Sequence, residues 1–246
     1  MHLTDRDRRI LRFCAEHRFV LAPHVALLLG VIGTDAAKRR LAALHRAGYL
    51  RRERRYVAEP FAYAVTSAGL GAAGSGLSRP LKLDPATYAH DVGVAWLAAA
   101  AHRGVFGELS EIVCERRMRS EYWRSDGDRQ RHGVRCAGVG GRGLHYPDLT
   151  VVTATGRRVA FELELHVKGA ARRERILAAY ACDPRFDAVV YLVRSEAERQ
   201  TLMRSARRVG LEDRLHVQRF EWAGGHEPGT SRERVPVRYR QRAVAR

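Results

Sequence analysis

The stretch at residues 34–56, TDAAKRRLAALHRAGYLRRERRY, decides the fold of the first part of the chain. Thr34 is a favourable N-cap residue, Asp35 complements the positive end of a helix dipole, and Gly48 suits the left-handed position that ends a helix. These signals predict a helix over residues 35–47, followed directly by a strongly basic strand.

At about 100° per residue, this helix has two faces. One face is an apolar stripe for a protein core and consists of Ala37, Leu41 and Leu44. The other face is cationic with two small residues at its centre, and consists of Arg39, Ala42, Ala43 and Arg46, with Lys38 and Arg40 at the flanks. The small side chains would let the backbone approach a DNA groove, where an alanine methyl group can contact a thymine methyl group. A solvated cationic helix is the alternative interpretation.

The composition limits the class of partner. The chain has 246 residues, of which 46% are hydrophobic, so it can form two modest domains with cores of their own. A net charge of +17 and a pI near 10.7 favour a polyanionic partner, and nucleic acid before a membrane surface. The start of the chain has no apolar leader, and no segment approaches the ~20 apolar residues of a membrane span, which predicts a cytoplasmic protein.

The residues around the basic helix predict a DNA-binding fold. Upstream, Thr4 and Asp7 form a capping-box pattern for a helix that ends near His17, and Pro23 and Gly30 bracket a second, short helix. Downstream, residues 49–56 and 61–66 predict a hairpin. This order is that of a winged helix-turn-helix with residues 35–47 in the recognition position. The first hairpin strand carries the arginines expected to contact phosphates, which are Arg51, Arg52, Arg54 and Arg55.

The expected fold class is α+β with two domains. Residues 1–74 should form the winged helix-turn-helix domain, in which Thr66 caps the last short helix. Residues 71–80 are rich in Gly, Ser and Ala, which predicts a linker, assigned to residues 75–86. A second, α/β domain is expected at residues 87–223, and the basic residues 224–246 predict a disordered tail.

The second domain is predicted to alternate helices and strands. Its periodicity indicates helices at residues 88–102, 170–181 and 196–209, and strands at 112–118, 149–152, 159–167, 186–193 and 215–222. Residues 126–143 have few apolar side chains and predict a mobile loop. Along residues 159–167, Glu162, Glu164 and His166 alternate and therefore share one face of a strand.

This order of elements, with HYPDLTVV and AFELELHVK on neighbouring strands, resembles the PD-(D/E)xK nuclease superfamily. The resemblance implies a restriction-endonuclease-like topology in which Asp148 and Glu162 hold Mg²⁺ through oxygen ligands, so that the metal activates water for phosphodiester cleavage. The position that the superfamily fills with lysine is Glu164 here, and some of its restriction enzymes share an acid at that position.

The only nearby lysine is Lys168, about 13 Å further along an extended strand than Glu164. Asp148, Glu162, Glu164 and Lys168 are therefore the candidate catalytic residues. The alternative is a nuclease-derived domain without catalysis, whose acids pair with basic residues of the next helix, Arg172, Arg173 or Arg175.

Taken whole, residues 3–195 resemble the replication-relaxation family of proteins from plasmids and integrated mobile elements. The matching N-terminal residues are LTDRDRRIL, the dipeptide Arg18-Phe19 with its aromatic residue, RRLAALHRAGYLRR and YAVTSAGL. The C-terminal ones are PDLTV and FELEL. The resemblance implies a DNA-binding protein associated with plasmid replication or mobilisation.

The sequence thus predicts a sequence-specific, double-stranded DNA-binding protein that acts in replication, mobilisation or transcription control and needs no cofactor to bind DNA. An Mg²⁺-dependent endonuclease targeted by the winged helix is the first alternative, and an adaptor for an acidic protein is the second. Duplex DNA is the expected partner, together with replication or transfer proteins of the mobile element. A homodimer remains an open alternative to a monomer.

Overall fold

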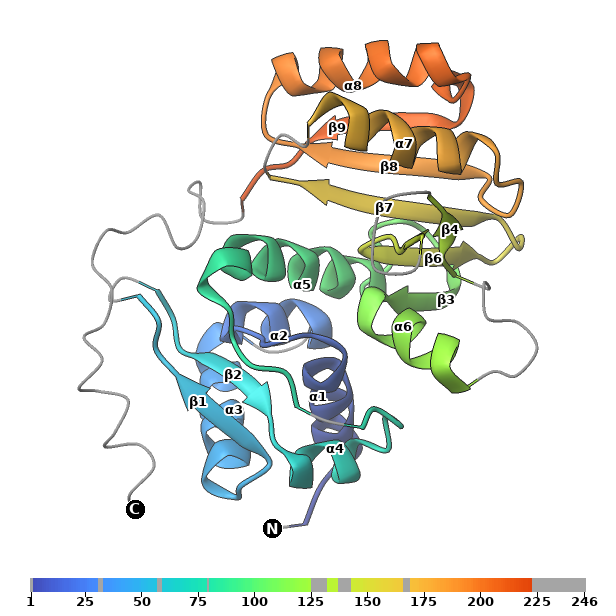
Figure 1. The fold of residues 1–246 in the computed structure, drawn as a ribbon. Coiled ribbons are helices and arrows are strands. Elements are labelled where there is room, and N and C mark those ends of the chain that lie inside the picture. The colour runs from blue at the N-terminus through green and yellow to red at the C-terminus, as the bar shows by residue number, and fades with distance from the viewer. Residues whose placement is uncertain are drawn as a thin grey trace. The chain divides into compact units, whose positions relative to one another are not determined.

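The computed structural model describes residues 2–30, 33–56, 59–78, 80–124, 132–136, 143–165 and 169–222. The protein is α+β, with helices and a mixed sheet (Figure 1), and it divides into two compact units after Ala95. This division falls inside helix α5 (Tyr88–His102), later in the chain than the predicted linker. The start of α5 packs within the first unit, because Tyr88 stacks on Phe19 with ring centroids 4.9 Å apart.

The first unit opens with helix α1 (Asp5–Glu16), and its predicted capping box is confirmed. The Thr4 hydroxyl accepts a hydrogen bond from the Asp7 amide at 3.3 Å, and the Asp7 carboxylate accepts one from the Thr4 amide at 2.8 Å. Both bonds satisfy amides that the helix itself leaves unpaired. The helix ends at His17, as predicted.

Helices α2 (Ala22–Leu29) and α3 (Thr34–Arg46) pack against each other. Gly30 ends α2 in the left-handed conformation with φ of 68°, as predicted. The prediction of Thr34 as the N-cap of α3 is wrong, because Gly33 is extended and takes the N-cap position without a side-chain hydrogen bond. Gly48 follows α3 with φ of 80°, the left-handed conformation that the sequence predicts.

A two-stranded antiparallel hairpin follows α3, formed by β1 (Leu50–Glu53) and β2 (Ala62–Val65). These strands are shorter than predicted, so Arg54 and Arg55 lie just beyond β1. Val20, between α1 and α2, forms an antiparallel bridge to Tyr63 through two hydrogen bonds of 2.8 Å. The predicted turn at residues 57–60 lies partly outside the described residues.

Helix α4 (Ser67–Ala73) packs on α1, and the Thr66 hydroxyl caps it by accepting a hydrogen bond from the Gly69 amide at 3.1 Å, as predicted. After it, the predicted linker is attached to the first unit at two points. The Leu81 carbonyl accepts a hydrogen bond from Arg51, and the Lys82 carbonyl accepts one from Arg18 at 3.0 Å. A short 3₁₀ helix, η1 (Pro85–Thr87), then leads into α5.

The second unit is built on a five-stranded mixed sheet with the order β3-β6-β7-β8-β9. Its strands are β3 (Leu109–Cys114), β6 (Leu149–Thr153), β7 (Arg158–Glu164), β8 (Ala188–Val193) and β9 (Leu215–Arg219). The pairs β3/β6 and β6/β7 are antiparallel, whereas β7/β8 and β8/β9 are parallel. The predicted hairpin turn at Thr155 and Gly156 joins β6 to β7, with Gly156 at φ of 84°.

Helices α7 (Ala170–Ala181) and α8 (Glu196–Val209) lie together over the parallel strands in Figure 1, and both have the predicted bounds. They bury one core with the sheet, which includes Ala160, Ile176, Leu177, Tyr180, Val189, Tyr191, Leu202 and Ala206. The chain between α8 and β9 contains a short 3₁₀ helix, η2 (Glu212–Arg214).

The predicted strand at residues 112–118 is wrong in its second half. The chain leaves the sheet after Cys114, and helix α6 (Glu115–Arg124) begins at the next residue. Glu115 suits the positive end of this helix and pairs with Arg119 at 2.7 Å, one turn later. Met118, expected in a strand, is fully buried under Val113 and Tyr146.

Part of the predicted loop at residues 126–143 is ordered as β4 (Val134–Arg135), which pairs with β5 (Leu144–His145). Residues 125–131, 137–142 and the tail at 224–246 lie outside the described residues. None of the helices in the described part of the chain is both long and apolar enough to cross a membrane.

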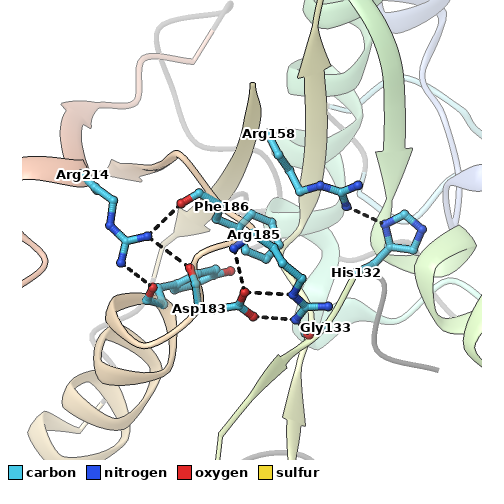
Figure 2. A network of polar contacts seen from close by, with 8 residues as sticks. His132, Gly133, Arg158, Asp183, Arg185, Phe186 and Arg214 are labelled. Carbon is cyan, nitrogen blue, oxygen red and sulfur yellow. Dashed lines mark hydrogen bonds and ion pairs between the residues drawn. The ribbon is translucent and has the colours of Figure 1, made fainter. Parts of the chain in front are cut away.

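A network of arginines fixes the end of α7 (Figure 2). The Arg214 guanidinium donates to the carbonyls of Tyr180, Ala181, Asp183 and Phe186 at 2.6–3.1 Å. Arg185 pairs with Asp183 at 2.5 Å and donates to the Gly133 carbonyl at 2.7 Å. Arg214 thus binds carbonyls in the last turn of α7 and in the connection to β8, and Arg185 joins that connection to the residue before β4.

Candidate functional site

Helix α3 divides its side chains as the sequence predicts. Ala37, Leu41 and Leu44 are fully buried. The opposite face is exposed at Arg39 and Arg46 and half-buried at the two residues between them, Ala42 and Ala43. Lys38 is exposed and forms an ion pair of 3.0 Å with Asp35 on the same helix. The outer face of the helix is therefore cationic at both ends and has small side chains between the two arginines.

Arg40 is separate from this outer face. Its guanidinium forms a bidentate pair with the Asp7 carboxylate, which is fully buried. Burial alone would raise the pKa of Asp7, but hydrogen bonds from Arg40 and Thr4 outweigh it and hold the pKa below its ordinary value. Arg40 therefore joins α3 to α1 and is part of the fold.

The four hairpin arginines fall into two pairs. Arg52 and Arg54 are exposed, and their guanidinium carbons lie 4.4 Å and 4.6 Å from the centre of the Phe61 ring. Arg51 and Arg55 are half-buried and make contacts within the protein. Arg51 donates to the Leu81 carbonyl, and Arg55 lies 3.5 Å from the carboxylate of Glu53. The sequence predicts the same role for all four, because it contains no sign of these long-range partners.

In the second unit, the sheet brings together the two acids predicted to hold a metal. The β6–β7 pairing ends with Leu149 opposite Phe161, and continuing this register by one residue places Asp148, which directly precedes β6, opposite Glu162. Residues directly opposite each other in an antiparallel pair point to the same face. Both side chains are buried, and one Asp148 oxygen accepts a hydrogen bond from the Leu163 amide at 2.7 Å.

The Glu162 carboxylate has two partners that the sequence does not predict. Its Oε1 accepts a hydrogen bond from the Tyr180 hydroxyl at 2.5 Å and lies 2.6 Å from Nε2 of His145. Tyr180 is fully buried, and a buried tyrosine hydroxyl needs a partner. That general rule is the only signal that could have linked these two residues, which are 18 positions apart.

The predicted arginine partners behave differently from one another. Arg173 is buried and donates to the Ser205 hydroxyl of α8 at 3.1 Å, whereas Arg172 and Arg175 are exposed. The two exposed arginines stabilise the thiolate form of Cys136, although burial dominates and raises its pKa. Helix α7, which carries both arginines, packs against β4.

Buried tyrosines surround the acids. Burial raises the pKa of Tyr180 well above its ordinary value, and the charge of Glu162 adds to the effect. Burial likewise raises the pKa of Tyr191, with contributions from the charges of Glu162, Glu164 and Asp148. Both hydroxyls therefore remain protonated at neutral pH and can act only as hydrogen-bond donors or as neutral acceptors.

The acids fit a magnesium site in donor type but provide a small ligand set. Mg²⁺ takes oxygen ligands and is commonly held by one or two carboxylates, which Asp148 and Glu162 can supply. Glu164 is also buried, two residues further along the strand. No group of three or more His, Cys, Asp and Glu side chains in the described ranges is arranged to hold a metal ion. Lys168 and His166 lie outside the described residues.

Comparisons with known proteins add no relative to these observations. No protein family, no curated protein and no solved structure matches the chain.

Proposed function

We propose that the protein is a sequence-specific, double-stranded DNA-binding protein, and that its first unit acts as a winged helix-turn-helix. The observation that carries this proposal is the outer face of α3, where Arg39 and Arg46 are exposed on either side of Ala42 and Ala43. An α-helix fits the major groove of B-DNA, and an arginine can bind the edge of a guanine through two hydrogen bonds.

The other parts of the first unit support the same assignment. The hairpin after α3 places further exposed cations, Arg52 and Arg54, next to the helix in sequence. The bridge from Val20 to Tyr63 joins the α1–α2 connection to this hairpin. In the proposal, Arg39, Ala42, Ala43 and Arg46 face the bases, and Lys38 and the exposed hairpin arginines face phosphates. The net charge of +17 favours such a partner.

The proposal extends to the setting in which the protein acts. The motifs shared with the replication-relaxation family support a role on a plasmid or integrated mobile element, in the control of replication, mobilisation or transcription.

Selection from random duplexes tests the proposal. The full chain is expected to enrich one short sequence. The logarithm of its binding constant for that sequence should fall linearly with the logarithm of the salt concentration, with a slope of about −0.9 for each neutralised phosphate. Recovery of no preferred sequence would contradict specific binding. Absence of any duplex binding at low salt would contradict the function altogether and favour an adaptor for an acidic protein.

The position of Asp148, directly before β6, next to Glu162 of β7 favours a second candidate function, a nuclease of PD-(D/E)xK type. A mixed sheet with α7 and α8 on one face is compatible with that topology. A bound Mg²⁺ would supply charge stabilisation and an activated water to phosphodiester cleavage. The residues of this chain would hold the two buried carboxylates in place, with Tyr180 and His145 fixing one oxygen of Glu162.

A cleavage assay separates the two candidates. The full chain is incubated with supercoiled DNA and Mg²⁺ or Mn²⁺, beside the variants Asp148→Ala and Glu162→Ala and the control Glu212→Ala, which removes an exposed acid from η2. Cleavage that both site variants abolish and the control retains would establish the nuclease. DNA binding without cleavage in either metal would favour the binding protein.

A further inference from the structure

The hairpin contains an arrangement that the DNA-binding assignment by itself does not explain. Arg52 and Arg54 are two residues apart, so their side chains leave the same side of the extended chain, about 7 Å apart along it. The β1–β2 register ends with Glu53 opposite Ala62, and one further pair places Arg54 opposite Phe61. The Phe61 ring therefore lies beside both arginines.

Both guanidinium groups contact this ring. Their central carbons lie 4.4 Å and 4.6 Å from its centroid, within the range of a favourable cation–π interaction. Two like charges so close together repel each other, and the negative face of an aromatic ring offsets part of that repulsion. Arg52 and Arg54 remain exposed in this arrangement. They are thus held together and still available to an anion in solvent.

Arg51 and Arg55 differ from this pair, because their guanidinium groups bind partners within the protein. Arg51 leaves the opposite side of the strand and donates to the Leu81 carbonyl, and Arg55 lies against the Glu53 carboxylate. These internal partners use part of each guanidinium's set of donors and fix the direction of both side chains. The hairpin region therefore has two exposed arginines that are available to a partner and two arginines that bind within the fold.

We propose that Phe61 is a positioning residue for DNA: its ring holds Arg52 and Arg54 side by side so that the pair binds two neighbouring phosphates of a duplex. This role depends on the DNA-binding function proposed for the first unit. Phe61 itself contacts neither a base nor a phosphate, and the pair contributes affinity without sequence preference, because phosphates carry no direct sequence information.

The test uses the full chain and measures duplex affinity against salt concentration for a selected and a random sequence. The double variant Arg52→Ala/Arg54→Ala should lower the salt slope by about 1.8 on both duplexes, because two phosphates lose their cations. The control Arg9→Ala/Arg12→Ala removes two exposed charges from α1 and should leave the slope unchanged. A wild-type slope in the hairpin variant, or an equal loss in the control, would overturn the proposal.

Phe61 is tested by two substitutions. Phe61→Leu keeps an apolar side chain but loses the aromatic face, and it should weaken binding to both duplexes about two- to fivefold, as expected from a cation–π contact at an exposed site. Phe61→Tyr keeps the ring and should restore wild-type affinity. If Phe61→Leu lowers the melting temperature but leaves affinity unchanged, or if Phe61→Tyr binds as weakly as Phe61→Leu, the ring has only a structural role.

These outcomes distinguish the positioning role of Phe61 from the DNA-binding function on which it depends. If the wild-type chain binds duplex DNA with a steep salt dependence while the Phe61 and hairpin variants match it, only the positioning role fails. If the wild-type chain does not bind duplex DNA at low salt, both proposals fail.

Discussion

The carboxylate of Asp7 stabilises the first unit through two different interactions. It completes the capping box of α1 with Thr4, and it forms the bidentate pair with Arg40 of α3. Its side chain has no exposed surface, so the charge depends on these partners for its stabilisation. The capping box is local and can be predicted from four residues of sequence. The pair with Arg40 spans 33 positions and cannot.

Replacing Arg40 with alanine is expected to destabilise the protein by about 3 kcal/mol, because a buried carboxylate loses its counter-ion. Lys38→Ala is the matched control on the same helix. Its ion pair with Asp35 is exposed, and the cost should stay within about 0.5 kcal/mol. Urea unfolding of both variants measures the difference, and equal costs would show that the Asp7–Arg40 pair contributes no more than a surface pair.

The same pair predicts a pH dependence. The pKa of Asp7 in the folded protein lies below its ordinary value of 3.8, so its contribution is fully present above about pH 4 and is lost as pH falls through the folded-state pKa. Stability should therefore decrease on acidification below pH 4, and Asp7→Asn should flatten this part of the curve. Urea midpoints between pH 2 and pH 7 measure the effect. Parallel curves for the two proteins would contradict it.

Two glycines of α4 give opposite predictions. A Cβ atom at Gly69 would lie 2.1 Å from the Tyr49 carbonyl oxygen, whereas one at Gly71 meets nothing within 4 Å. Gly69→Ala should therefore destabilise by about 1–3 kcal/mol, since backbone must shift to make room. Gly71→Ala should stabilise by up to about 1 kcal/mol, because alanine favours a helix interior. Thermal unfolding of the pair measures the signs, and the same sign for both would refute this packing.

Helices were the most predictable elements. The bounds of α5, α7 and α8 agree with those read from periodicity and caps, and Ser195 caps α8 with a capping box. The short apolar run at Ile112, Val113 and Cys114 carries too little periodicity to show that the chain turns into α6 at Glu115. Strand ends were less predictable for a related reason, because hydrogen bonds to a distant neighbour decide where a strand stops.

The end of α7 depends on a residue from a different element. Arg214 donates to the carbonyls of Tyr180 and Ala181 in the last turn of α7 and to two carbonyls after it, and the side chain of Tyr180 binds Glu162. No pattern near residue 180 indicates this partner, because 34 positions separate the two residues.

Arg214→Ala should cost about 1.5–3 kcal/mol, the range for hydrogen bonds to a charged group. Arg207→Ala, on the exposed face of α8, is the control and should change stability by less than about 0.5 kcal/mol. Arg214→Lys should behave like the alanine variant, because one ammonium group cannot reproduce the planar set of donors. Denaturant midpoints of the three variants measure these differences. A lysine variant as stable as wild type would show that the planar guanidinium is not required.

For the molecule as a whole, the sequence predicted two compact parts and an α+β class, but it gave all four hairpin arginines one role and no internal partner to Arg40 or Arg214. Contacts divide them into groups with different partners: Arg40 holds α1 to α3, Arg214 holds the end of α7, and Arg39 and Arg46 remain exposed. The acids Asp148 and Glu162 were predictable because Glu162 lies on a recognisable strand and Asp148 directly precedes another. The positions of Tyr180 and His145 around them were not.

Binding of the full chain to its selected duplex and to a random duplex, at one salt concentration, is the most direct test of DNA recognition by α3. Arg39→Ala and Arg46→Ala should each lose about 1–3 kcal/mol on the selected sequence and much less on the random one, because an arginine at a base edge discriminates between bases. Arg12→Ala, which removes an exposed charge from α1, should keep the wild-type ratio of the two affinities. If all three variants weaken both duplexes by the same factor, α3 does not read the DNA sequence.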